Sequence, residues 1–182
     1  GWHSTATIGT FGAAVGASRM LGLDGEKCAL AMGIAGTQAA GLKSMFGTMC
    51  KPLHAGKAAQ NGLFAANMAA RGFTSRPDIL ERHQGFAHTQ TEETDILAGL
   101  LGLRERFEVR DALFKYHAAC YMTHSTIEAI HSIQRKANLV PENIEKVDVT
   151  VVTGACDVCG IPTPSSGLEG KFSLRYCAAI AI

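Results

Sequence analysis

The chain has 182 residues, a formal net charge of +1 and a charged fraction of 18%. This length suits one domain or somewhat more, and an apolar fraction of 47% supports a sizeable core. The near-neutral charge and the absence of basic runs argue against nucleic-acid binding. No apolar run reaches the ~18 residues of a membrane span. Because charged residues usually make up about a quarter of a protein, we expect further chain or a partner to cover part of the surface.

The first part of the chain has the pattern of an all-helical region. Apolar residues recur at helical spacing among many glycines and alanines, which permit close helix packing. Asp24 is expected to cap the second helix, and Gly72 to follow the third. The polar stretch 83–94 is expected to be irregular. Helices are predicted over residues 4–22, 25–40, 54–70 and 76–82.

The pattern changes near residue 105. Residues 107–110 read as a short strand, and residues 142–152 as a second strand in which valines alternate with polar side chains. A helix is predicted between them, over 119–138. A Gly/Pro/Ser-rich loop, 154–168, precedes a terminal helix.

These patterns predict a mainly α fold with two parts. Residues 1–106 are expected to belong to an all-helical domain, and residues 107–182 to begin an α+β lid domain. The chain starts at Gly1 without a methionine and stops at Ile182 within an apolar helical pattern. We therefore expect an internal part of a longer protein.

The cysteines are predicted to be free thiols, because a core of this size does not need disulfide staples. Free thiols are typical of a reducing compartment, so we expect a cytoplasmic protein. One CxxC pair, Cys156 and Cys159, has no second pair to complete a metal site, and structural thiols explain it better. The cysteines lie at positions 28, 50, 120, 156, 159 and 177.

His3 is the first candidate site residue, because it precedes a predicted helix. Unpaired backbone N–H groups at a helix start favour an anion, and a histidine ring there adds a group that can exchange a proton. In the alternative interpretation, Ser4 or Thr5 caps the helix and His3 packs locally. Both interpretations stay open at this point.

Lys51 and His54 form the second candidate site, three residues apart before an alanine-rich segment. Pro52 is expected to keep Lys51 out of the helix. A lysine ammonium suits a carboxylate or phosphate, and both side chains can face one ligand. A solvated lysine and a capping histidine are the alternative.

The third candidate is the segment FKYHAACYMTH, residues 114–124, which gathers Lys115, His117, Cys120 and His124 at a helix start. Cys120 and His124 have the spacing of metal ligands on one helix, but no further ligand pair is adjacent, which argues against zinc. The chain also lacks GxGxxG, GxxxxGK[ST] and GxSxG motifs, so nucleotide cofactors and nucleophile-elbow hydrolases are disfavoured.

Together these stretches resemble the MmgE/PrpD family, which includes 2-methylcitrate dehydratase, cis-aconitate decarboxylase and iminodisuccinate epimerase. The resemblance runs through essentially the whole chain. The segments that carry it are GWHSTATIGTFGAA (1–14), KPLHAGKAAQNG (51–62), GFT (72–74), FKYHAACYMTH (114–124) and EGKFSLRYCAA (169–179).

The resemblance implies a large helical domain, a smaller α+β lid and an active site in the cleft between them. By motif match, the catalytic candidates are His3, Lys51, Lys115 and Tyr176. The substrate-binding candidates are His54, Cys120 and His124. Cys120 stands where decarboxylase-like members carry a histidine, which weakens the decarboxylase interpretation.

The resemblance further implies a lyase that needs no cofactor, no metal and no iron–sulfur cluster, and that acts on a small di- or tricarboxylate. We expect a hydro-lyase similar to 2-methylcitrate dehydratase, and a homodimer. An epimerase, a decarboxylase or a non-catalytic carboxylate-binding relative is the alternative. These 182 residues alone are expected to be inactive.

Overall fold

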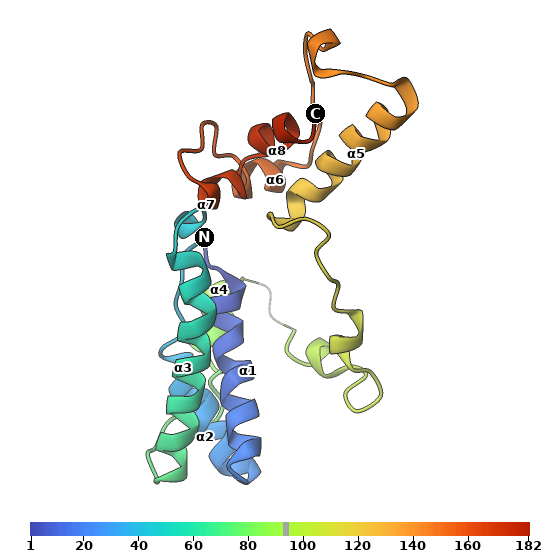
Figure 1. The fold of residues 1–182 in the computed structure, drawn as a ribbon. Coiled ribbons are helices and arrows are strands. Elements are labelled where there is room, and N and C mark those ends of the chain that lie inside the picture. Colours follow the sequence, from blue (N-terminus) through green and yellow to red (C-terminus); the bar gives the residue numbers. More distant parts are fainter. Residues whose placement is uncertain (93–94) are drawn as a thin grey trace. The chain divides into compact units, whose positions relative to one another are not determined.

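The computed structural model describes residues 1–92 and 95–182, and its architecture is mainly helical, as predicted (Figure 1). The chain divides into two compact units. Unit 1 contains residues 1–44 and 52–112, and unit 2 contains residues 45–51 and 113–182. Within the described ranges, no helix is long and apolar enough to cross a membrane.

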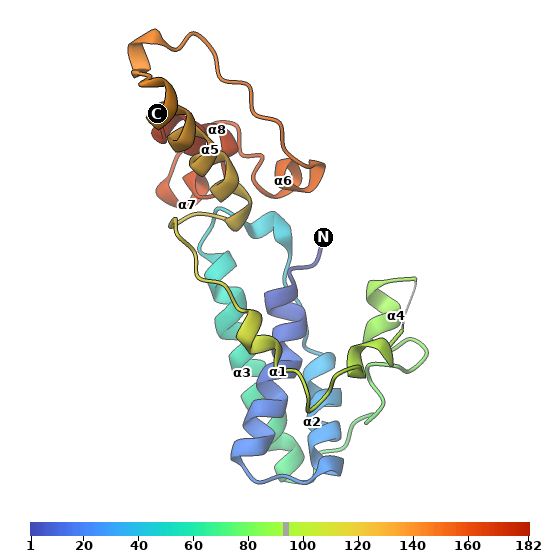
Figure 2. The ribbon, with the colours of Figure 1, turned by 90° about the vertical axis from the view of Figure 1, so that its right-hand side faces the viewer.

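Unit 1 is built on three long helices that pack side by side (Figures 1 and 2). Asp24 caps the second of them, as predicted, because its carboxylate accepts a hydrogen bond from the Lys27 N–H at 2.8 Å. Gly72 follows the third with φ of +85°, also as predicted. The helices of this unit are α1 (Ser4–Met20), α2 (Gly25–Gly36), α3 (Cys50–Ala70, of which the first two residues belong to unit 2), α4 (Phe86–Gln90) and the 3₁₀ segments η1 (Lys43–Met45, of which the last residue belongs to unit 2), η2 (Ala98–Leu100) and η3 (Glu108–Asp111).

Small side chains let these helices approach closely. The buried cluster that joins α1, α2 and α3 consists of Ala14, Ala31, Ile34, Ala35, Ala65, Ala66 and Ala69. Where α3 meets α1, a Cβ on Gly62 would lie 2.5 Å from the Ala14 nitrogen and 2.6 Å from the Ala13 carbonyl carbon. Gly62 is therefore required by the contact between the two helices.

Two expected helix boundaries differ from the structure. Helix α2 ends at Gly36 rather than at residue 40, and α3 begins at Cys50 rather than at residue 54. The Thr48 hydroxyl accepts a hydrogen bond from the Cys50 N–H at 3.2 Å and so supports the earlier start. Pro52 is accommodated in the first turn, where its missing N–H costs nothing. Lys51 is therefore helical, and the expectation that Pro52 excludes it was wrong.

The predicted helix over 76–82 was also wrong. The segment forms turns, in which the Arg82 N–H donates to the Asp78 carbonyl at 3.0 Å and the Phe86 N–H, from outside the segment, donates to the Ile79 carbonyl at 2.7 Å. The stretch 83–94, expected to be irregular, contains α4 instead. Residues 93 and 94 of that stretch lie outside the described residues.

Unit 2 is organised around α5 and α8, which share a small apolar core. The predicted helix over 119–138 is confirmed as α5, and α6 occupies the start of the segment expected to be a loop. The core is formed by Ile127, Ile130, Cys177, Ala178 and Ala181. The helices of this unit are α5 (Tyr121–Ala137), η4 (Pro141–Asn143), α6 (Thr153–Val158), α7 (Gly167–Gly170) and α8 (Leu174–Ile180).

Both predicted strands were wrong. Residues 107–110 largely form the 3₁₀ segment η3, and residues 144–152 have no regular structure. A strand needs a neighbouring strand to pair its backbone N–H and C=O groups. Within residues 1–92 and 95–182, β-type pairing is limited to two isolated bridges, Trp2 with Leu42 and Gly160 with Ser173. The alternating valines therefore lack the partner that would make them a strand.

The tight contact at Gly62 generates a stability prediction. Gly62→Ala is expected to cost about 1–3 kcal/mol, because the new methyl group collides with the α1 backbone. Gly12→Ala is the matched control, since no atom lies within 4 Å of a Cβ there; alanine should stabilise α1 by up to about 1 kcal/mol. Thermal unfolding followed by circular dichroism measures both. A Gly62→Ala variant that melts as high as Gly12→Ala would contradict the packing.

Candidate functional site

His3 and His54 form a buried pair in unit 1. Their Nδ1 atoms lie 2.9 Å apart, their ring centroids lie 5.1 Å apart, and each residue is 8% exposed. Because an N···N hydrogen bond needs one donor and one acceptor, one Nδ1 carries the proton and the other is bare. The pair can therefore pass one proton between two rings.

Backbone pairing holds His3 in place. The His3 N–H donates to the Gly41 carbonyl at 2.9 Å, and the Lys43 N–H donates to the Gly1 carbonyl at 2.8 Å. Gly41 has φ of +150°, and a Cβ there would meet the Ala6 side chain and lie 3.2 Å from His54 Cδ2. Gly41 is thus needed for the ring of His54 to reach His3.

The N-terminus of α1 is not capped by Ser4 or Thr5, as the alternative interpretation expected. His3 itself is the N-cap residue, with extended φ and ψ and no capping bond from its side chain. Ser4 begins the helix, and Thr5 lies within it. Neither residue therefore occupies the cap position, and the imidazole of His3 is directed to His54 instead.

Lys51 lies in unit 2, on the first turn of α3. Its ammonium nitrogen is 6.0 Å from the Phe46 ring centroid and 5.8 Å from that of Phe172. The two rings pack with centroids 5.1 Å apart. Aromatic faces attract a cation, so they orient this lysine.

Lys115 and Cys120 lie at the start of α5. The Lys115 ammonium group donates to the Ala119 carbonyl at 3.0 Å. The Cys120 N–H donates to the Lys171 carbonyl at 2.9 Å, and Cys120 is the N-cap residue of the helix. A thiol at this position experiences the positive end of the helix dipole, which favours the thiolate.

The Cys120 thiol is strongly acidified. The pKa of Cys120 is lowered from 9.0 to about 6, and a hydrogen bond from the Cys159 thiol is the main cause. Burial opposes this shift. The Met122 backbone and the charges of Lys115 and Lys51 lower the pKa further. The same thiol contact and burial raise the pKa of Cys159 above its usual range. Lys51 and Lys115 thus both act on one thiol.

His124 lies one turn further along α5. It is 7% exposed, and neither ring nitrogen has a hydrogen-bond partner among the described residues. Its ring centroid lies 5.1 Å from those of Tyr121 and His117. His117 is in turn tied to Glu128, with Nε2 2.8 Å from Oε1. The sequence placed His124 among the substrate-binding candidates, but these contacts are with aromatic rings.

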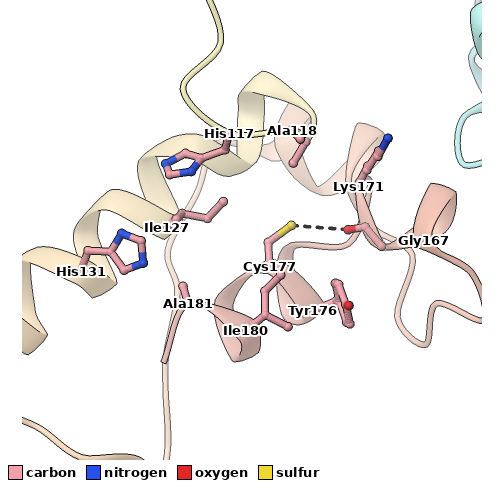
Figure 3. Close-up of a pocket in the computed structure, with 12 residues that line it drawn as sticks. His117, Ala118, Ile127, His131, Gly167, Lys171, Tyr176, Cys177, Ile180 and Ala181 are labelled. Atoms are coloured by element: carbon pink, nitrogen blue, oxygen red, sulfur yellow. Dashed lines mark hydrogen bonds between the residues drawn. The ribbon is translucent and has the colours of Figure 1, made fainter.

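Tyr176 lines a cavity of about 340 Å³ in unit 2. Figure 3 shows His117 and His131 on the α5 side of this cavity and Lys171 and Tyr176 on the other side. Neither Lys115 nor Cys120 lines it. Ala119 and Lys171, whose carbonyls accept hydrogen bonds from Lys115 and Cys120, do line it.

Two site groups result, one in each unit. Unit 1 brings together His3 and His54, and unit 2 brings together Lys51, Lys115 and Cys120. The sequence analysis did not identify Cys159 as a site residue. The only sequence signal for it was the CxxC motif, which was interpreted as a pair of structural thiols. Within the described ranges, no group of three or more His, Cys, Asp or Glu residues is arranged to hold a metal ion.

Comparison with protein families gives a direct assignment. Residues 1–97 match the MmgE/PrpD N-terminal domain, and residues 117–182 match the MmgE/PrpD C-terminal domain. The chain belongs to the MmgE/PrpD family. The resemblance predicted from the motifs is thereby confirmed.

Curated relatives of this MmgE/PrpD chain include several cis-aconitate decarboxylases. That of Aspergillus terreus (strain NIH 2624 / FGSC A1156) is 34% identical over the whole chain, and that of Homo sapiens is 28% identical over 97% of it. The cis-aconitate decarboxylase-like protein oryM of Aspergillus oryzae is 32% identical over 74% of the chain. The chain spans 40% of the length of the A. terreus relative and 38% of the human one.

The environment of Cys120 predicts its pH dependence. Because only the thiolate reacts, alkylation of Cys120 by iodoacetamide should reach half its maximal rate near pH 6 and fall below that pH as the thiol is protonated. Cys159→Ala and Lys115→Met should both move the midpoint upward, since each removes a group that favours the thiolate. Mass spectrometry of labelled peptides measures the rate. A wild-type midpoint near pH 9 would contradict the hydrogen-bonded thiolate.

Proposed function

We propose that the protein is a lyase that acts on a small di- or tricarboxylate without a cofactor. The observation that carries this proposal is that Lys51 and Lys115, which are far apart in the sequence, both favour the negative charge of one group, the Cys120 thiolate. A position that two lysines make positive also suits a substrate carboxylate.

The proposed roles follow from the chemistry of each group. Lys51 and Lys115 bind carboxylates, and Cys120 and His124 contact the substrate. His3 exchanges a proton with the substrate carbon or the leaving hydroxyl. His54 positions His3 and shares its proton, which the 2.9 Å contact supports. Tyr176 donates a hydrogen bond to the substrate.

The domain assignment is part of the proposal. We assign residues 1–106 to the helical domain and residues 107–182 to the beginning of the lid domain. We further propose a cytoplasmic homodimer.

Two lyase reactions remain in competition, and one observation favours each. Cysteine at position 120, where decarboxylase-like members carry histidine, favours dehydration of a substrate such as 2-methylcitrate. The similarity to cis-aconitate decarboxylases favours loss of CO₂ from cis-aconitate. Both reactions require a group that transfers a proton at carbon or oxygen and cations that bind the carboxylates.

The reaction is tested by incubating the full-length protein with 2-methylcitrate, citrate and cis-aconitate in parallel. Dehydration produces a new C=C bond, seen as ultraviolet absorbance, without CO₂. Decarboxylation of cis-aconitate releases CO₂, which a coupled assay detects. We expect one of these signals. If no substrate is consumed but a tricarboxylate still binds in calorimetry, the lyase proposal fails in favour of a carboxylate-binding relative.

The lysine pair is tested separately. Lys51→Met and Lys115→Met should each lower kcat/KM about 10- to 100-fold, mainly through KM, because each removes a charge-assisted contact worth about 1.5–3 kcal/mol. Lys57→Met is the matched control, since this exposed lysine of α3 bonds only Gln60 among the described contacts, at 2.9 Å. Turnover and KM equal to wild type in Lys51→Met would rule out its binding role.

A further inference from the structure

We propose that Cys120 and Cys159 form a dithiol site that peroxide oxidises to a disulfide. Cys120 is the thiol that reacts first, and Cys159 is the thiol that resolves the product. The site lies wholly in unit 2, and its formation does not depend on the proposed lyase activity.

Backbone hydrogen bonds bring the two cysteines together from distant parts of the sequence. The segment from Lys171 to Leu174 lies between them: its Lys171 carbonyl accepts from the Cys120 N–H at 2.9 Å, and its Leu174 N–H donates to the Cys159 carbonyl at 3.0 Å. The Cys159 thiol is also the neighbour that most strongly lowers the pKa of the Cys120 thiol. The two thiols therefore interact before any oxidation.

The two thiols differ in the way that a reactive and a resolving cysteine must differ. Cys120 is partly exposed, caps α5 and is near the charges of Lys115 and Lys51, so its thiolate is favoured. Cys159 is 1% exposed and keeps its proton. An oxidant from solvent therefore reaches Cys120 first.

The other cysteines are less suited to this reaction. The buried Cys177 thiol donates to the Gly170 carbonyl, with Sγ 3.4 Å from the oxygen, and burial raises its pKa. Cys156 is exposed and precedes Cys159 by three residues, so it is the competing partner that the experiment must exclude.

The reaction balances with hydrogen peroxide as the oxidant. The Cys120 thiolate attacks one peroxide oxygen, forming an S–O bond as the O–O bond breaks and hydroxide leaves. The sulfur is oxidised to sulfenic acid, and the peroxide is reduced. The Cys159 sulfur then attacks the Cys120 sulfur, the S–S bond forms, and the hydroxyl leaves as water with the proton of Cys159. The hydroxide takes up the proton that Cys120 lost on ionisation, so two thiols and one peroxide give one disulfide and two waters.

One consequence does depend on the proposed function. The disulfide removes the negative sulfur from beside Lys51 and Lys115, in the region assigned to the substrate. Peroxide would then alter the substrate-binding region, and a thiol reductant would restore it.

The test treats the native full-length protein with hydrogen peroxide, blocks free thiols with N-ethylmaleimide and maps disulfides by mass spectrometry under non-reducing conditions. We expect a crosslinked peptide pair that joins Cys120 to Cys159 and has lost two hydrogens. At pH about 6, Cys120 should be oxidised about tenfold faster than the thiol of a reference cysteine peptide. A Cys156–Cys159 disulfide, or a Cys120 that stays reduced, would overturn the proposal.

Variants separate the two roles. Cys159→Ser should leave Cys120 as a sulfenic acid that dimedone traps, whereas Cys120→Ser should abolish both the trapped adduct and the crosslink. Cys156→Ser is the matched control and should crosslink as wild type does. Crosslinking that is lost in Cys156→Ser would contradict the assignment of partners. If a variant fails to fold, the disulfide mapping of the wild-type protein still tests the proposal.

Discussion

The structure of unit 2 depends on the way in which the Lys171–Leu174 segment ties together elements that are distant in sequence. The start of α5 bonds to one end of the segment, and the residues after α6 bond to the other. Phe172, within the same segment, packs on Phe46 and so orients Lys51. One short segment therefore determines where a thiol pair and a lysine meet.

The gathering of positive charge has a physical cost that a ligand can relieve. Two ammonium groups near one point repel each other, and the cluster holds them with aromatic faces and a backbone carbonyl. Within the lysine–thiol cluster, the Cys120 thiolate is the negative group that reduces this repulsion. A bound carboxylate would do the same, which is why one geometry supports both the proposed substrate site and the reactivity of the thiol.

In unit 1, the small residues of the core determine how closely the helices pack. Its alanine and glycine core gains little apolar area per residue, but it lets α1 and α3 approach until the two histidine rings touch. Larger core residues would bury more surface and would push His54 away from His3. The buried imidazole pair therefore depends on the small residues that surround the helices.

Sequence patterns identified the long helices because an apolar stripe and a cap are local signals. Asp24 and Gly72 lie where the pattern placed them, whereas the valines of residues 147–151 failed as a strand predictor, since a strand exists only when another strand pairs with it. The motifs likewise identified Lys51, Lys115 and Cys120 as site candidates, but not Cys159. By itself, the sequence determined the family, the helical class and the types of side chain available for chemistry. Only the tertiary structure decided that Cys159 donates to Cys120 and that His3 bonds His54, because both contacts join residues tens of positions apart that backbone pairing and helix packing bring together.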